Sequence, residues 1–141
     1  MDCVREQELS WAVGVPYAEW MVDDPGRSWR FLLTEGGLRW VVGSRAVQSA
    51  VVEHIAGLSL CEHVEVGVID QVSPKKMVAP ETFHLYGERA AELDGTLGPA
   101  FVENAADLSM LHGMFERLWA HAHHGDDARA LLSRIARAVR R

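Results

Sequence analysis

The sequence predicts a small α/β domain, with α+β as the alternative arrangement, and three observations lead to this class. Apolar side chains alternate with polar ones over Trp29–Leu33 and again over Val64–Ile69, a pattern typical of strands that are buried mainly on one face. Between these segments, apolar residues recur with helical spacing from Val47 to Leu58. A strand, a crossover helix of this length and a second strand are usually parallel. We therefore expect one βαβ unit at the centre of the domain.

Residues that start and end helices mark the limits of this unit. Ser44 follows Gly43 and can accept hydrogen bonds from the first free amides of the helix. The helix is expected to stop near Gly57, because glycine readily adopts the left-handed conformation found at helix ends. Three polar residues on the side opposite the apolar stripe are expected to face water: Gln48, Ser49 and Glu53.

The rest of the chain is expected to cover and extend the βαβ unit. An N-terminal helical segment covers residues 1–26, the sheet with its crossover helix residues 27–104, and a C-terminal helical pair residues 105–141. Short strands are predicted at 82–86, 90–93 and 100–103, and would join the first two strands in a small mixed sheet. Residues 1–141 are thus interpreted as a single domain, covered by one N-terminal and two C-terminal helices.

Composition limits the classes of protein that this chain can represent. Its 141 residues are 48% apolar and include five tryptophans, enough to bury one core. The net charge of −6 argues against a protein that binds nucleic acid on its own. No apolar run approaches the roughly 18 residues of a membrane-spanning helix. Two cysteines, Cys3 and Cys61, are expected to be unpaired in a reducing cytoplasm.

Polar residues follow both strands of the predicted unit. Thr34 and Glu35 come after the first strand, and Asp70 and Gln71 come after the second. The carboxyl ends of parallel strands meet at one edge of a sheet, where ligands commonly bind. Two carboxylates at that edge could act as an acid and a base, bind a cation or hold an amine. The alternative is structural: Glu35 caps the apolar segment that follows it, and Asp70 is a solvated turn residue.

Other candidate motifs favour ordinary structural roles. His121, His123 and His124 follow the long C-terminal helix, and a polar helix end explains them better than a metal site with three converging ligands. His112 and Glu116 have the spacing of a surface pair on a helix. The sequence has no GxSxG, GxGxxG or GxxxxGK[ST] motif, so it predicts neither a nucleophile elbow nor a phosphate-binding loop. No metal or cofactor is expected.

The tryptophans are candidates to line an aromatic pocket for a small organic ligand. Trp29 and Trp119 lie on apolar faces and are more simply explained as core residues. Trp20 and Trp40 have less defined surroundings. These two are therefore the tryptophans to consider as ligand contacts.

The chain resembles a known family over roughly residues 29–136. The run LLTEGGLRWVVGSRAVQSAVVEHIAGLSLCEHVEVGVI is similar to the family pattern of a strand, a Thr-Glu segment, a Val-Gly turn, a helix and an alternating valine strand. The segments FHLYG, RAAELDG and MFERLWAHA resemble its later strands and helix. This family is the domain that follows XRE-type helix-turn-helix domains in actinomycete antitoxin-like transcriptional regulators, the Scr family. The resemblance implies a regulatory domain. Its gene neighbourhood would discriminate between functions, because a biosynthetic cluster and a toxin-like neighbour predict different ones.

The chain differs from the family pattern in three ways. The N-terminal DNA-binding domain of the family is expected to be absent, which agrees with the acidic charge. Asp70 and Gln71 stand where the family usually has a proline, and Gly36 and Gly37 replace two small helix-forming residues. The resemblance therefore implies an effector half that has been separated from its DNA-reading half and redeployed.

From these observations we expect a non-catalytic domain that binds a small molecule or a partner protein at the carboxyl edge of the sheet. Its contact residues would be Trp40, Glu35 and Asp70, together with Tyr86. The alternative is a small stand-alone enzyme of specialised metabolism, in which Glu35, Asp70 and His84 provide acid and base groups.

A third interpretation is a dimerisation partner that buries apolar surface on the Leu108–Ala122 helix. The expected partners are therefore a small molecule, another protein or a second copy of the chain. Neither direct nucleic-acid binding nor membrane binding is expected.

Overall fold

The computed structural model describes residues 24–74 and 82–141. Contacts within the chain group into two compact units, one formed by residues up to Ser73 together with Ala122–Arg141, and the other by Pro74–His121. Each unit is described by itself below. That residues 1–141 behave as a single domain stays a prediction.

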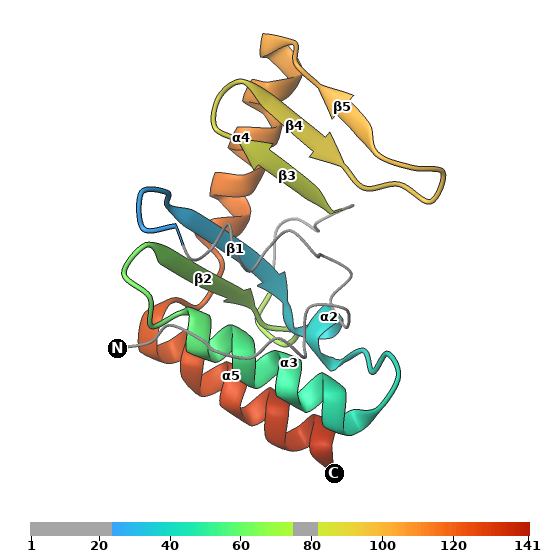
Figure 1. Cartoon of the computed structure of the whole chain (residues 1–141), viewed down its shortest axis with the longest axis vertical. Coiled ribbons are helices and arrows are strands. Elements are labelled where there is room, and N and C mark those ends of the chain that lie inside the picture. Colours follow the sequence, from blue (N-terminus) through green and yellow to red (C-terminus); the bar gives the residue numbers. More distant parts are fainter. Residues whose placement is uncertain (1–23, 75–81) are drawn as a thin grey trace. The chain divides into compact units, whose positions relative to one another are not determined.

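The first unit contains the expected βαβ arrangement (Figure 1). It consists of β1 (Trp29–Thr34), α2 (Glu35–Arg39), α3 (Arg45–Leu58), β2 (Val64–Ile69) and α5 (Gly125–Arg140). The two strands are parallel and fully in register, from Trp29 opposite Val64 to Thr34 opposite Ile69. The predicted parallel pairing is therefore confirmed.

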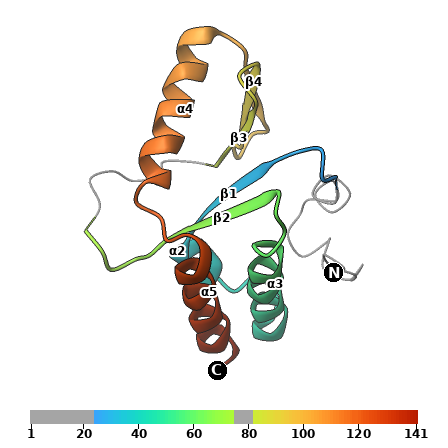
Figure 2. The same cartoon turned by 90° about the vertical axis from the view of Figure 1, so that its left-hand side faces the viewer.

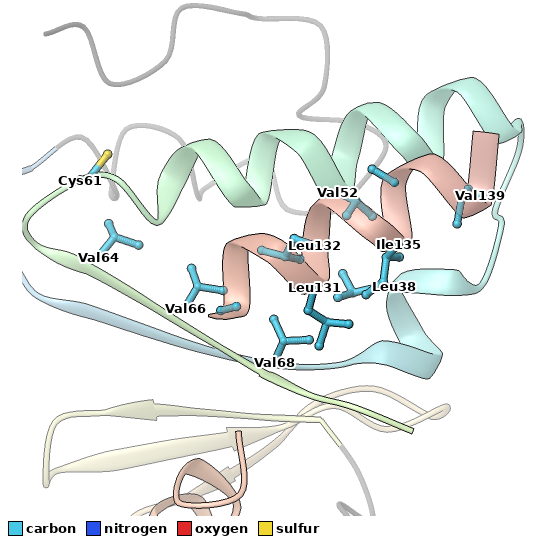
Figure 3. Packing of buried hydrophobic residues seen from close by; sticks show 12 residues of the cluster. Leu38, Val52, Cys61, Val64, Val66, Val68, Leu131, Leu132, Ile135 and Val139 are labelled. Carbon is cyan, nitrogen blue, oxygen red and sulfur yellow. The ribbon is translucent and has the colours of Figure 1, made fainter. Parts of the chain in front are cut away.

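The core of this unit lies between the two-stranded sheet and two helices. Figures 1 and 2 show α3 and α5 side by side on one face of β1 and β2. Alternate valines of β2, Val64, Val66 and Val68, point toward these helices (Figure 3). They belong to one buried cluster with Leu131 and Leu132 of α5. The largest hydrophobic side chains with no exposed surface are Val52, Val68, Leu132 and Ile135.

Ser44 begins α3 as expected, and its Oγ accepts a hydrogen bond from the Val47 amide at 3.2 Å. Gly43 before it has a φ of +81°, a conformation in which glycine avoids the strain of a Cβ atom. α3 ends at Leu58, so the prediction that it stops near Gly57 is confirmed. The expected reason is not, because Gly57 is not among the glycines with positive φ.

Ser49 is the second correction to the predicted helix. It was expected to face water, but its side chain is fully buried against α5. Its Oγ donates to the Ala136 carbonyl at 3.1 Å and accepts from Arg140 Nε at 3.2 Å. The small side chain allows two helix backbones to approach while its one polar atom stays bonded, which a hydrophobic-periodicity argument does not anticipate.

The second unit is a three-stranded antiparallel sheet covered by one helix. It contains β3 (Phe83–Tyr86), β4 (Ala90–Leu93), β5 (Ala100–Val102) and α4 (Ala105–Trp119). Buried Leu108 and Leu111 of α4 pack against Ala91 and its apolar neighbours on the sheet.

The α/β class is confirmed, but the strands form two sheets and not the single mixed sheet that the sequence suggested. The short turn between β3 and β4 makes their local pairing entropically cheap, and α4 supplies an apolar cover of its own. The two C-terminal helices consequently cover different sheets, α5 on the first and α4 on the second. The expected N-terminal helix and Trp20 lie outside the described residues.

Two further expectations concern the environment of the chain. Among the described residues, no helix is long and apolar enough to cross a membrane. Cys61 is buried and is not a free thiol, which corrects the expectation of two unpaired cysteines. Cys3 lies outside the described residues. The argument from free thiols to a reducing compartment therefore fails, and a cytoplasmic location stays a prediction.

Candidate functional site

Glu35 and Asp70 follow immediately after the last paired residues of the parallel strands, Thr34 and Ile69. The carboxyl ends of β1 and β2 thus meet at one edge, as the sequence predicted. The two following loops touch: a Cβ atom on Gly36 would lie 2.9 Å from Gln71 Nε2, so only glycine fits without a shift. Both carboxylates are buried, with 7% of Glu35 and 8% of Asp70 exposed.

Asp70 is bonded through both carboxylate oxygens. Oδ1 accepts from the amides of Val72 at 2.9 Å and Ser73 at 2.6 Å, and Oδ2 lies 2.9 Å from His123 Nε2. The Ser73 amide is the largest influence and lowers the pKa of Asp70; burial opposes it, but the His123 bond adds to the lowering. The pKa of Asp70 consequently lies well below its usual range, and the group is ionised at neutral pH.

His123 reaches Asp70 because its backbone is attached to β2. Val68 and His123 form an antiparallel bridge, with the Val68 amide donating at 3.0 Å and the His123 amide at 2.8 Å. Because Asp70 is ionised, Nε2 carries the proton of this bond and donates it. The imidazole is 40% exposed. The sequence assigned His123 to a polar helix end, but α4 ends at Trp119 and His123 lies in the connection to α5.

Glu35 is held in a similar way at the start of α2. Thr34 caps this short helix, with its Oγ1 accepting from the Gly37 amide at 3.3 Å. Glu35 Oε2 accepts from the Gln71 amide at 2.9 Å, and Oε1 accepts from Arg39 at 2.8 Å. Burial raises the pKa of Glu35, but the Gln71 and Arg39 donors together outweigh it, so the pKa lies below its ordinary value.

These bonds decide what the two carboxylates can do. A general acid must hold a proton near neutral pH, and neither Glu35 nor Asp70 does. Their oxygens also bind the chain's own amides, guanidinium and imidazole, so they build the edge of the sheet. The interpretation of Asp70 as a solvated turn residue is wrong, because the group is buried. Within residues 24–74 and 82–141, no three His, Cys, Asp or Glu side chains could hold a metal ion.

Apolar side chains, in contrast, are exposed in the loops that follow the two strands. Trp40 at the end of α2 is 75% exposed, Val42 is 69% exposed, and Val72 beyond Asp70 is 88% exposed. We call these three residues the apolar rim. Exposed tryptophan and valine side chains in the loops that follow the strands of a sheet are typical of recognition surfaces.

Comparison with known families shows which family the chain belongs to. A family model described as "Domain of unknown function (DUF5753)" matches residues 11–134, most of the chain. The chain belongs to the DUF5753 family. Searches of curated proteins and of solved structures found no match.

Two predicted site residues of this DUF5753 domain lie in its second unit. His84 and Tyr86 both belong to β3, where His84 Nε2 lies 3.0 Å from Asp94 Oδ2 and the Tyr86 hydroxyl donates to Glu92 Oε2 at 2.8 Å. Within the first unit, the histidine that accompanies Asp70 is His123. Residue spacing carries no signal for that pair, because the two residues are 53 positions apart.

The DUF5753 domain also has a small cavity in its first unit, of about 190 Å³. It lies beside the first three residues of β2 and the amino end of α5, and is therefore separate from the carboxyl edge. Ligand pockets for drug-sized molecules are typically about 300–1,000 Å³. Its lining residues are Ser59, Val64, Glu65, Val66, His124, Gly125 and Arg129.

Proposed function

We propose that this DUF5753 domain is a non-catalytic recognition domain, related to the effector half of Scr-family helix-turn-helix regulators. It binds a partner protein or a small molecule through the apolar rim at the carboxyl edge of β1 and β2. The observation that carries the proposal is a contrast in burial after the two strands. The carboxylates Glu35 and Asp70 are buried, whereas Trp40 and Val72, which follow them in the chain, are exposed.

The electrostatics of the edge support binding in preference to acid-base chemistry. Glu35 and Asp70 each accept several hydrogen bonds from the chain itself. Such preorganised carboxylates hold two loops in fixed positions, and fixed loops present Trp40 and Val72 with little conformational entropy left to lose on binding. Glu35 and Asp70 therefore act as positioning residues, and the rim makes the contact.

The exposure of the rim favours a protein over a small molecule as its partner. A small ligand gains affinity by being enclosed, with most of its surface buried in a cavity. The rim residues are each more than two-thirds exposed, so a ligand resting on them would stay largely in water. A protein surface can cover exposed side chains of this kind, with Trp40 as the anchoring residue.

Affinity capture with matched variants tests the proposal. The wild-type domain, Trp40→Ala, Val72→Ser and Leu60→Ala are used as baits in lysate of the source cells, with quantitative mass spectrometry as the readout. Leu60 is the control because it is also exposed, at 60%, but precedes β2 at the opposite end of the strand. A partner retained by wild type and Leu60→Ala and lost by both rim variants supports the proposal. Equal capture by all four proteins contradicts it.

A thermal-shift screen of metabolite fractions tests for a small-molecule partner. A ligand present at 100 times its Kd adds about 2.7 kcal/mol to the free energy of unfolding. A hit whose shift is lost in Trp40→Ala and kept in Leu60→Ala would identify the small-molecule form of the function. A shift that survives in Trp40→Ala would place that ligand away from the rim.

One observation favours the enzyme as the second candidate. Asp70 orients a half-exposed imidazole, as in sites where a carboxylate holds a histidine base. In this alternative His123 takes the role that the sequence gave to His84. Hydrolysis of p-nitrophenyl acetate that is abolished in His123→Gln and kept in His54→Gln would support it. Equal rates in the two variants would remove it.

A further inference from the structure

The sheet of the second unit has one face covered by α4 and one face that no described residue of this unit covers. Side chains alternate along each strand, and the inward set, which includes Leu85, Ala91 and Val102, packs in the cluster with α4. Figure 2 shows α4 against one side of this sheet. The outward set carries the polar and aromatic groups, with Tyr86 48% and Phe101 72% exposed.

Strand register places the outward side chains next to one another. Glu92 on the central strand lies opposite His84 of β3 and opposite Phe101 of β5. The Tyr86 hydroxyl donates to Glu92 at 2.8 Å, and His84 pairs with Asp94 at 3.0 Å. We call these five residues the outer face of the second unit.

The charge of this unit determines which partner the outer face can attract. Residues 82–121 contain six carboxylates and two arginines, Arg89 and Arg117. Over the whole unit, Pro74–His121, seven carboxylates outnumber four lysines and arginines. Two of the six carboxylates, Glu92 and Asp94, belong to the outer face itself. Its aromatic rings present π surfaces that attract cations in addition to covering apolar area. An anionic partner would be repelled, whereas a cationic one meets both kinds of attraction.

We infer that the outer face binds a basic protein segment and holds an arginine or lysine side chain beside Glu92 and Phe101. The carboxylate accepts hydrogen bonds from the cation, and Phe101 and Tyr86 cover its apolar stem and its charged head. An open sheet face suits an extended segment, which can place several side chains along it. This inference goes beyond the proposed function, because it concerns a different unit and a different chemistry from the apolar rim.

Fluorescence anisotropy with labelled octa-arginine tests this inference, using octa-glutamate as the reversed-charge probe. We expect octa-arginine to bind and octa-glutamate not to bind. Glu92→Gln should weaken octa-arginine binding about two- to fivefold, the range expected for one exposed cation contact. Glu116→Gln removes the same charge from α4, the helix on the other side of the sheet, and should change the affinity far less. Equal losses in the two variants would show non-specific attraction and overturn the inference.

Phe101→Leu tests whether the aromatic ring contributes to binding, because leucine keeps an apolar side chain but has no ring. The substitution changes no charge. Phe101 is largely exposed, so leucine should leave folding intact while removing the π surface. We expect Phe101→Leu to weaken octa-arginine binding about two- to fivefold. Unchanged affinity in this variant would exclude the aromatic contribution. Equal binding of octa-arginine and octa-glutamate to the wild type would exclude a cation-binding site on the outer face. The rim variant Trp40→Ala should bind octa-arginine as wild type does, which separates this outcome from that of the proposed function.

Discussion

The Asp70 carboxylate and the His123 imidazole meet at 2.9 Å although 53 positions separate them in the chain. The same histidine exchanges two backbone hydrogen bonds with Val68. Through its side chain and its backbone, His123 attaches the segment between α4 and α5 to the end of β2. The edge of the sheet that carries the apolar rim is therefore stabilised by a segment from the far end of the sequence.

Asp70→Ala should destabilise the first unit substantially. The substitution removes the acceptor for two amides and an imidazole at a buried position, and leaving such donors unpaired costs about 2–4 kcal/mol. Asp94→Ala is a matched control, because Asp94 also pairs with a histidine but both side chains are 49% exposed. The control should cost less than about 1 kcal/mol. Urea unfolding at pH 7 measures both, and equal losses would show that the Asp70 bonds add nothing to stability.

Acidification should remove the stabilisation that Glu35 and Asp70 provide. Both groups have folded-state pKa values below their ordinary values of 4.5 and 3.8. The unfolded chain therefore takes up protons first, so the stabilisation is complete above about pH 5 and is lost as pH falls through the folded-state pKa values. Urea unfolding between about pH 7 and pH 3 should show a decline that is less steep in Asp70→Asn. If the free energy of unfolding fell with pH equally in Asp70→Asn and in the wild type, the lowered pKa of Asp70 would be contradicted.

Local patterns were enough to predict the parallel strand pair and the edge that it creates. Once the strands are parallel and in register, Glu35 and Asp70 must follow at the same end, so their proximity follows from topology. Neither the His123 bond to Asp70 nor the Ser49 bond to Ala136 has such a local signature. Both bonds depend on how α5 and the segment before it pack against the first unit. The spacing of apolar residues within one helix or strand does not predict this packing.

Ser49 provides a test of this long-range packing. Because its hydroxyl bonds Ala136 and Arg140 in a fully buried position, Ser49→Ala should cost about 1 kcal/mol. Ser49→Leu should cost more, because the larger side chain forces α3 and α5 apart. Ala46→Leu, at an exposed position of the same helix, should be close to neutral. If Ser49→Leu were as neutral as Ala46→Leu in urea unfolding, Ser49 would face water as its helical spacing suggested.

Gly57→Ala should raise the stability of the domain. Gly57 lies within the last turn of α3, is not among the glycines with positive φ, and leaves open space for a Cβ atom. Alanine loses less backbone entropy on folding and favours the helix, so a gain of about 0.5–1 kcal/mol is expected. Gly43→Ala is the counterpart: its Cβ would also have open space, but the φ of +81° imposes strain of about 1 kcal/mol or more. Opposite shifts of the urea midpoint are the expected result. Loss of stability in Gly57→Ala would mean that this glycine ends the helix in a left-handed conformation.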